Sequence, residues 1–293
     1  MVSARYFFSC FVRTMFHGAL VLLMSCATDT QQVRRGVEIS PVSPAPRRQE
    51  IPHQTQEVPR GQNASLKGQG FPKPVGQNRV LFLGDSLSVG EFGRTFDQAL
   101  RNRGFEVYTS VAGGGTPYYW LREYPPVSID ITYWERTPSS QRRLPRIQAV
   151  PKVETLISKW NPDIIVVQTG TNLYAPLRSK KRSKAANVKE VESVVEKMCR
   201  VTTDNGCRKL YWITPPEAHT KRYPQALQDE MLAITQRVAG KYGPVFNSYQ
   251  VTSYTEPYPS SDGIHLGRAQ AKRWAESVSR DFCSQFRSSR ELN

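Results

Sequence analysis

Short apolar runs that alternate with amphipathic helical patterns constrain the fold of this chain most, and they begin near residue 79. Such runs are typical of strands that are buried on both faces. Between the runs, apolar residues recur at helical spacings of three and four, as at 188–198, 227–238 and 271–282. Strands that alternate with helices predict a parallel sheet with helices on both faces, and ligands of such sheets bind beyond the carboxyl ends of the strands. The predicted strands are 80–83, 106–110, 164–168, 210–214 and, more weakly, 244–247.

A serine follows the first predicted strand directly, in the segment GDSL at 84–87. In a tight strand-to-helix turn its hydroxyl stands at the edge of the sheet, beside the N–H groups of a helix N-terminus. Serine is a weak nucleophile and needs a base. Asp262 and His265 lie three residues apart before the last predicted helix, so the carboxylate can hold the Nδ1 proton while Nε2 faces Ser86. These residues predict a Ser-His-Asp catalytic triad.

Two glycine-containing turns predict an oxyanion hole. Three consecutive glycines at 113–115 follow the second strand, where a backbone without side chains can aim an N–H group at a substrate oxygen. Asn172 follows the third strand, and its side-chain amide is another donor. Either turn alone would be ordinary turn chemistry. Beside the triad, the two turns predict Ser86 N–H, a backbone N–H of the glycine turn at 113–115 and the Asn172 amide as the donors.

Together these segments resemble the SGNH/GDSL hydrolase family, over roughly residues 78–293. The segment at 84–87 matches the family's name motif letter for letter, and 262–265 matches its Asp-x-x-His. The family's Gly-x-Asn falls on Gly170 and Asn172, and the four blocks come in the family's order.

The resemblance implies a flavodoxin-like, three-layer α/β/α fold with a central parallel sheet. It places the family's oxyanion glycine on Gly113, with Gly114 as the alternative register. It also implies serine-dependent ester chemistry that needs no metal and no organic cofactor. Leu173 stands where the family usually has Asp, which weakens any inference about the substrate.

The first 77 residues predict an export signal and a tether. Arg5 and Arg13 precede an apolar stretch at 15–24, about half the length of a membrane-spanning helix, so residues 1–26 read as a secretory signal. Its end, LMSC, resembles the lipobox of bacterial lipoproteins, with Cys26 as the lipidated residue; plain cleavage after Ala27 is the alternative. Residues 27–77 hold seven prolines and no apolar periodicity, which predicts a disordered linker. The predicted location is the periplasm or cell envelope, with a lipid tether to a membrane.

Composition and charge narrow the classes of partner. The 39% hydrophobic content excludes a wholly disordered chain, and the absence of an apolar run of roughly 18–20 residues excludes a polytopic membrane protein. The formal net charge is +15, of which +10 falls in 78–293. Such a surface favours acidic polymers or lipid headgroups, and no nucleic-acid motif accompanies it.

Export also bears on the five cysteines, which lack the spacing of a zinc site. Cys199 and Cys207 flank a predicted helix end and strand start, so an oxidising compartment permits a disulfide between them. Cys283 is left over. Three separate buried thiols are the alternative.

Residues 117–150 form a long connection rich in aromatic and arginine side chains. Long loops at the active edge usually build specificity, and aromatic faces with arginines suit sugar rings that carry acids. Trp120, Trp134 and Arg122 are therefore the predicted substrate-binding residues. A small hairpin that packs its own aromatics is the alternative.

The leading interpretation is a serine esterase that hydrolyses short acyl esters, chiefly O-acetyl, on an anionic cell-envelope polysaccharide or peptidoglycan. A polysaccharide O-acyltransferase would use the same triad with a sugar hydroxyl as acceptor. A lysophospholipase or thioesterase is a third enzyme class. A polymer-binding lipoprotein without catalysis is the rival from outside enzymes, and a Ser86→Ala variant separates it from all three.

Overall fold

The computed structural model describes residues 78–122, 131–147, 149–204 and 209–286. The chain divides into two units, 1–64 and 65–293, and every described residue belongs to the second. The predicted signal and linker, with Cys26, lie outside the described residues. None of the described helices is long and apolar enough to cross a membrane.

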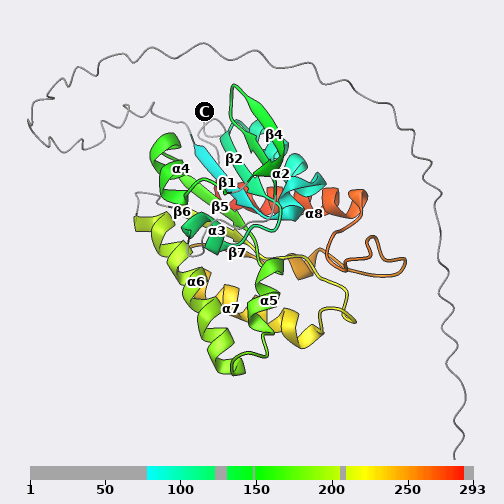
Figure 1. The fold of residues 1–293 in the computed structure, drawn as a ribbon. Helices are drawn as coiled ribbons and strands as arrows, with labels where there is room; N and C mark the ends of the chain where they lie inside the picture. The colour runs from blue at the N-terminus through cyan, green and yellow to red at the C-terminus, as the bar shows by residue number, and fades with distance from the viewer. Residues whose placement is uncertain (1–77, 123–130, 148, 205–208, 287–293) are drawn as a thin grey trace, which may run out of the picture. The chain divides into compact units, whose positions relative to one another are not determined.

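A seven-stranded sheet with the order β4-β3-β2-β1-β5-β6-β7 forms the centre of this unit (Figure 1). Five of its strands pair in parallel, in the spatial order β2-β1-β5-β6-β7. This is the flavodoxin-like order of a doubly wound α/β fold, so the predicted α/β class and parallel centre are confirmed. The parallel strands are β1 (Arg79–Gly84), β2 (Glu106–Ala112), β5 (Ile164–Gln168), β6 (Lys209–Ile213) and β7 (Val245–Phe246).

Helices cover both faces of the sheet because successive residues of each strand point to opposite sides. In β1, Val80 and Phe82 join the core under one helix layer, whereas Leu81 and Leu83 join the core under the other. The first layer is α1 (Ser86–Val89), α2 (Glu91–Asn102) and α8 (Arg268–Gln285). The second is α3 (Pro117–Leu121), α4 (Val153–Trp160), α5 (Tyr174–Leu177), α6 (Lys184–Asp204) and α7 (Gln225–Ala239).

A hairpin in the 117–150 connection extends the sheet beyond β2. Strands β3 (Ile131–Arg136) and β4 (Gln141–Ile147) pair antiparallel, and β3 also pairs antiparallel with β2. The specificity interpretation requires this segment to be a loop at the active edge. Most of it is instead part of the sheet. The alternative of a hairpin that packs its own aromatics is the one observed, since Tyr133 and Trp134 are buried on opposite faces.

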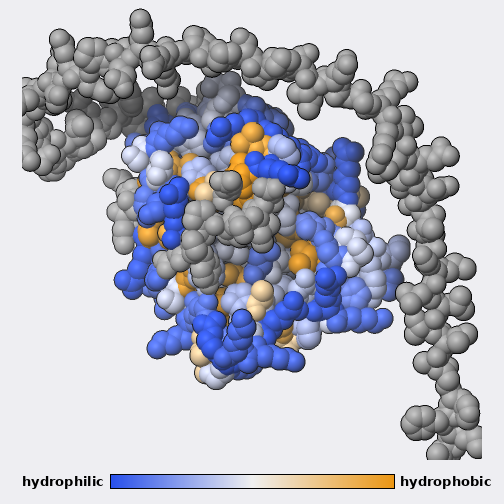
Figure 2. All heavy atoms as spheres, in the orientation of Figure 1, coloured by the Kyte–Doolittle hydropathy of each residue, from blue (hydrophilic) through white to orange (hydrophobic). Residues whose placement is uncertain are grey.

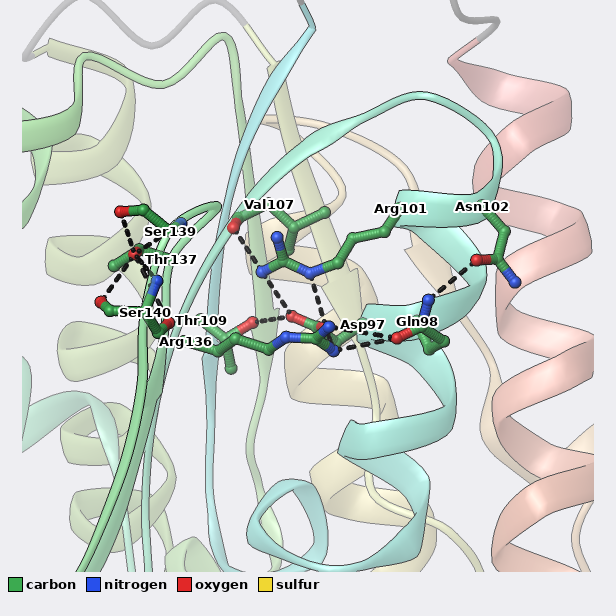
Figure 3. Close-up of polar contacts among 10 residues, drawn as sticks. All are labelled: Asp97, Gln98, Arg101, Asn102, Val107, Thr109, Arg136, Thr137, Ser139 and Ser140. Atoms are coloured by element: carbon green, nitrogen blue, oxygen red, sulfur yellow. Dashed lines mark hydrogen bonds and ion pairs between the residues drawn. The ribbon is translucent and has the colours of Figure 1, made fainter.

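A buried ion-pair network fastens this hairpin to α2 (Figure 3). The fully buried carboxylate of Asp97 accepts hydrogen bonds from Arg101 Nε (2.8 Å), Arg136 Nη1 (2.6 Å) and Thr109 Oγ1 (2.5 Å). Arg101 belongs to α2, Thr109 to β2 and Arg136 to β3. One carboxylate thus joins three elements, and its charge is compensated in the interior.

The predicted Cys199–Cys207 disulfide is not formed. Cys199 lies in α6 as a free thiol, its side chain is fully buried in the core, and burial raises its pKa to about 12. Its side chain packs into the protein, as an apolar group would. Cys283 is also free of a disulfide, and Cys207 lies outside the described residues.

Candidate active site

The turn after β1 places Ser86 at the carboxyl end of that strand, as predicted. Asp85 caps α1 through its carboxylate, which accepts a hydrogen bond from Leu87 N–H at 3.0 Å. A Cβ atom on Gly84 would lie 2.3 Å from Ser88 Oγ, so the tightness of this turn requires glycine. Ser86 begins the helix and is only half-buried, which leaves its hydroxyl accessible to a substrate.

The three predicted triad residues meet at this turn. His265 Nε2 lies 3.0 Å from Ser86 Oγ, and His265 Nδ1 lies 2.5 Å from Asp262 Oδ2. Gly263, at φ +76°, makes the turn that brings Asp262 and His265 together. The predicted geometry of the triad is therefore confirmed, although 179 positions separate the serine from the histidine.

The second oxygen of the Asp262 carboxylate is fully engaged. Oδ1 accepts hydrogen bonds from the N–H groups of Ile264 (2.8 Å) and His265 (3.0 Å) and from Ser260 Oγ (2.6 Å). Partial burial acts to raise the pKa of Asp262, but these bonds and the one to His265 outweigh it and lower the pKa well below its usual value. Asp262 is thus ionised at neutral pH, which fixes the His265 tautomer with the proton on Nδ1 and leaves Nε2 to accept from Ser86.

Ser260 is a site residue that the sequence analysis missed. Its hydroxyl bonds to Asp262, and the hydroxyl of Tyr254 donates to the Ser260 carbonyl at 2.7 Å. The only sequence signal is a hydroxyl two residues before the aspartate, a spacing typical of local polar turns.

The predicted oxyanion role of Gly113 is wrong. Gly113 N–H donates to Thr132 O at 2.7 Å and so belongs to the pairing between β2 and the hairpin. Gly114, the alternative register, has φ +69° and lies partly exposed. Its N–H has no acceptor among the residues that the structure describes. Gly114 is therefore the better donor for a substrate oxygen.

Asn172 lies in a short 3-10 helix, η1 (Thr171–Leu173), after β5. Its Nδ2 donates to Gly115 O at 3.3 Å, and Thr169 Oγ1 donates to the same carbonyl at 3.1 Å. These two bonds hold the glycine turn against the segment after β5 that carries Thr169 and Asn172. Because an amide nitrogen carries two hydrogens, Asn172 can still donate one to a substrate.

Two of the three predicted substrate-binding residues are buried. Trp120 is 0% and Trp134 3% exposed, so neither indole offers a face to a sugar ring, and their predicted role is wrong. The large apolar rings instead fill the core on the two sides of the sheet. A Cβ atom added to Gly115 would lie 2.7 Å from the Trp120 ring. This ring therefore packs directly against the glycine turn and supports it. Arg122 is exposed at the end of α3, and its binding role stays a prediction.

The amide of Asn172 is expected to contribute strongly to catalysis. We expect an Asn172→Ala variant to lose about 10²–10³-fold in kcat on a small ester with little change in KM, because the donor acts on charge that develops in the transition state. Steady-state kinetics on 4-nitrophenyl acetate measures this. Asn102→Ala, at the exposed end of α2, is the matched asparagine control. Equal losses in both variants would contradict the assignment.

Asp85 gives the domain a predictable dependence on pH. Complete burial raises its pKa from 3.8 to about 6, although bonds from Leu87 and Thr171 oppose the rise. The folded state then binds a proton more tightly than the unfolded state, so stability falls as pH rises from about 4 to about 6. We expect this group to cost about 2 kcal/mol at pH 7 relative to pH 4. Urea unfolding at both pH values measures this. The free energy of unfolding of Asp85→Asn, relative to that of the wild type, should be higher at pH 7 than at pH 4 by that amount. The same relative value at both pH values would contradict the burial of a charge here.

Metal ligands do not gather at this site. Within the described ranges, no three His, Cys, Asp or Glu side chains are placed to hold a metal ion.

No family model matches the chain, and no curated protein sequence matches it. Several solved structures do match it. The acetyl xylan esterase AlAXEase is 14% identical, with a TM-score of 0.49, over 69% of this chain and 98% of its own. TesA is 15% identical, with a TM-score of 0.48, over 71% of this chain and 99% of its own. A peptidoglycan O-acetylesterase is 9% identical, with a TM-score of 0.43, over 71% of this chain and 91% of its own. Strand order and the placing of the four blocks agree with the resemblance drawn from the sequence. The fold is a doubly wound α/β fold with the flavodoxin-like strand order.

Proposed function

We propose that this chain is a serine ester hydrolase. The observation that carries the proposal is the continuous chain of hydrogen bonds from Ser86 through His265 to Asp262. His265 Nε2 takes the proton of Ser86 Oγ as this oxygen attacks the ester carbonyl. The carbonyl oxygen becomes an oxyanion that the N–H groups of Ser86 and Gly114 and the amide of Asn172 stabilise. The imidazolium then protonates the leaving alcohol, which leaves an acyl group on Ser86.

A water molecule completes the cycle. His265 removes its proton, the resulting hydroxide attacks the acyl-serine, and the oxyanion again occupies the same donors. Collapse of this second intermediate releases the carboxylic acid and returns the proton to Ser86. Throughout, Asp262 stays ionised and stabilises the positive charge on His265.

The proposed substrate is a short acyl ester, chiefly O-acetyl, on an anionic polysaccharide of the cell envelope. The side chains of His265 and Asp262 are 45% and 44% exposed, so the site lies at an open edge that a polymer can reach. The face seen in Figure 2 is mainly hydrophilic, with apolar residues in small separate groups. The net charge of +10 in 78–293 favours a polyanion. A signal with lipidation at Cys26 and a linker over 27–77 would give the domain reach into the envelope.

Salt dependence tests this substrate class. We expect acetate release from an acetylated acidic polysaccharide to fall as ionic strength rises from about 10 mM to about 150 mM, because the Debye length shrinks from roughly 30 to 8 Å. Hydrolysis of neutral 4-nitrophenyl acetate should hardly change. Equal salt sensitivity of both substrates, or a preference for long-chain acyl esters, would contradict the polysaccharide proposal and favour a lipase-like enzyme.

A further inference from the structure

Two loops beside the triad are fastened to each other. One follows β6 and covers 214–224, and the other precedes α8 and covers 251–267, including Asp262 and His265. Four hydrogen bonds join them. Two run from the first loop to the turn at 261–263, His219 N–H to Gly263 O (2.8 Å) and Arg222 Nη1 to Ser261 O (3.0 Å). The other two involve Glu217, whose N–H donates to Thr252 Oγ1 (3.1 Å) and whose Oε2 accepts from Tyr254 N–H (3.3 Å). Side chains of the first loop therefore lie directly against the turn that holds the catalytic aspartate and histidine.

An aromatic shelf of His219, Tyr254 and Tyr258 spans these loops. The ring centroids of His219 and Tyr258 are 3.8 Å apart, and those of Tyr254 and Tyr258 are 5.6 Å apart in a stacked arrangement. Tyr254 is buried and bonded through its hydroxyl to Ser260, the partner of Asp262. Tyr258 is 38% exposed, so the outermost ring of the shelf is open to solvent while the two rings behind it hold it in place.

Cationic side chains flank the shelf. Arg178, Lys221 and Arg222 are exposed, and none of them pairs with a carboxylate in the part of the chain that the structure describes. The acids of the two loops are already engaged: Glu217 accepts from Tyr254 N–H, Asp262 bonds to Ser260, Ile264 and His265, and Glu256 lies beside the Tyr258 hydroxyl. Positive charge without a partner and an exposed, supported ring thus occur together beside the triad.

We propose that the aromatic shelf is the glycan-binding surface of this enzyme. The face of Tyr258 stacks on the apolar C–H face of a sugar ring, and Lys221 and Arg222 bind carboxylates on neighbouring sugar units. The inference rests on the proposed esterase function and defines its substrate as an acetylated glycan that carries carboxylates. It also assigns to Tyr258 the stacking role that the buried Trp120 and Trp134 cannot fill.

The test compares three esters with the full-length protein: O-acetylated polygalacturonate, O-acetylated xylan and 4-nitrophenyl acetate. For each variant we take the ratio of kcat/KM on a polymer to kcat/KM on the small ester, which removes any general effect on the triad. We expect Tyr258→Ala to lower this ratio about five- to ten-fold for both polymers, and Tyr258→Phe to keep it, because the ring face remains. Lys221→Ala should lower the ratio about three-fold for the acidic polymer alone.

Lys272→Ala, an exposed lysine on α8, is the matched control and should keep both ratios. The proposal is overturned if Tyr258→Ala behaves like Lys272→Ala, or if Lys221→Ala lowers the ratio equally for the neutral xylan. Failure of the esterase function looks different, since the wild type would then hydrolyse none of the three esters faster than Ser86→Ala does.

Discussion

A Ser86→Ala variant should lose about 10⁴- to 10⁶-fold in kcat on 4-nitrophenyl acetate, down to the level that the oxyanion donors alone can support. The loss is large because acyl transfer requires the Oγ atom that lies 3.0 Å from His265 Nε2. Substrate binding should change little, since the alanine removes only the reacting hydroxyl. Stopped-flow or overnight absorbance assays cover this range of rates.

Ser139→Ala is the matched control, because this serine lies exposed in the turn between β3 and β4. It should keep wild-type kinetics. If Ser86→Ala keeps its activity while the fold is intact by circular dichroism, Ser86 is not the nucleophile. A wild type that hydrolyses the ester no faster than Ser86→Ala, both without turnover, would favour the polymer-binding interpretation.

The second large effect concerns stability. An Asp97→Ala variant should be about 3–5 kcal/mol less stable than the wild type, because Arg101 and Arg136 lose their shared carboxylate in the interior. Urea unfolding followed by tryptophan fluorescence measures the free energy of unfolding. Asp97→Asn, which keeps the shape of the side chain but not its charge, should recover part of the loss.

An exposed ion pair provides the comparison. Glu192 pairs with Arg237 between α6 and α7, where both side chains reach solvent, so Glu192→Ala should cost less than about 1 kcal/mol. A loss in Asp97→Ala no larger than that in Glu192→Ala would show that the network does not anchor the hairpin.

The parallel strands and the triad could be predicted because their signals are local. Each buried strand is an uninterrupted apolar run, and the segments at 84–87 and 262–265 carry the reacting groups within four residues. Parallel strands place their carboxyl ends at one edge, so the topology brings those segments together.

The sequence leaves a hairpin in 117–150 open as an alternative, but the pairing of this hairpin with β2 could not be predicted, and that pairing decides two of the corrections. Strand β4 contains three arginines and Pro145, and all of it is exposed or half-exposed, so it shows no apolar alternation. Without this hairpin, the three glycines at 113–115 look equivalent, yet its Thr132 carbonyl takes up Gly113 N–H. The same hairpin buries Trp134. The pairing of β3 with β2 therefore decides that Gly114, and not Gly113, has an N–H that is free within the described part of the chain, and that Trp134 is buried. Such tertiary pairing has no local signal in the sequence.

Covalent labelling tests the central claim, that Ser86 is an activated nucleophile, most directly. The protein is incubated with an alkyl fluorophosphonate, digested with trypsin and analysed by mass spectrometry. We predict one phosphonyl group on the peptide 80–94, at Ser86 and not at the buried Ser88, with labelling abolished in Ser86→Ala and strongly slowed in His265→Ala. No adduct on the native protein, or an adduct that persists in Ser86→Ala, would contradict the account.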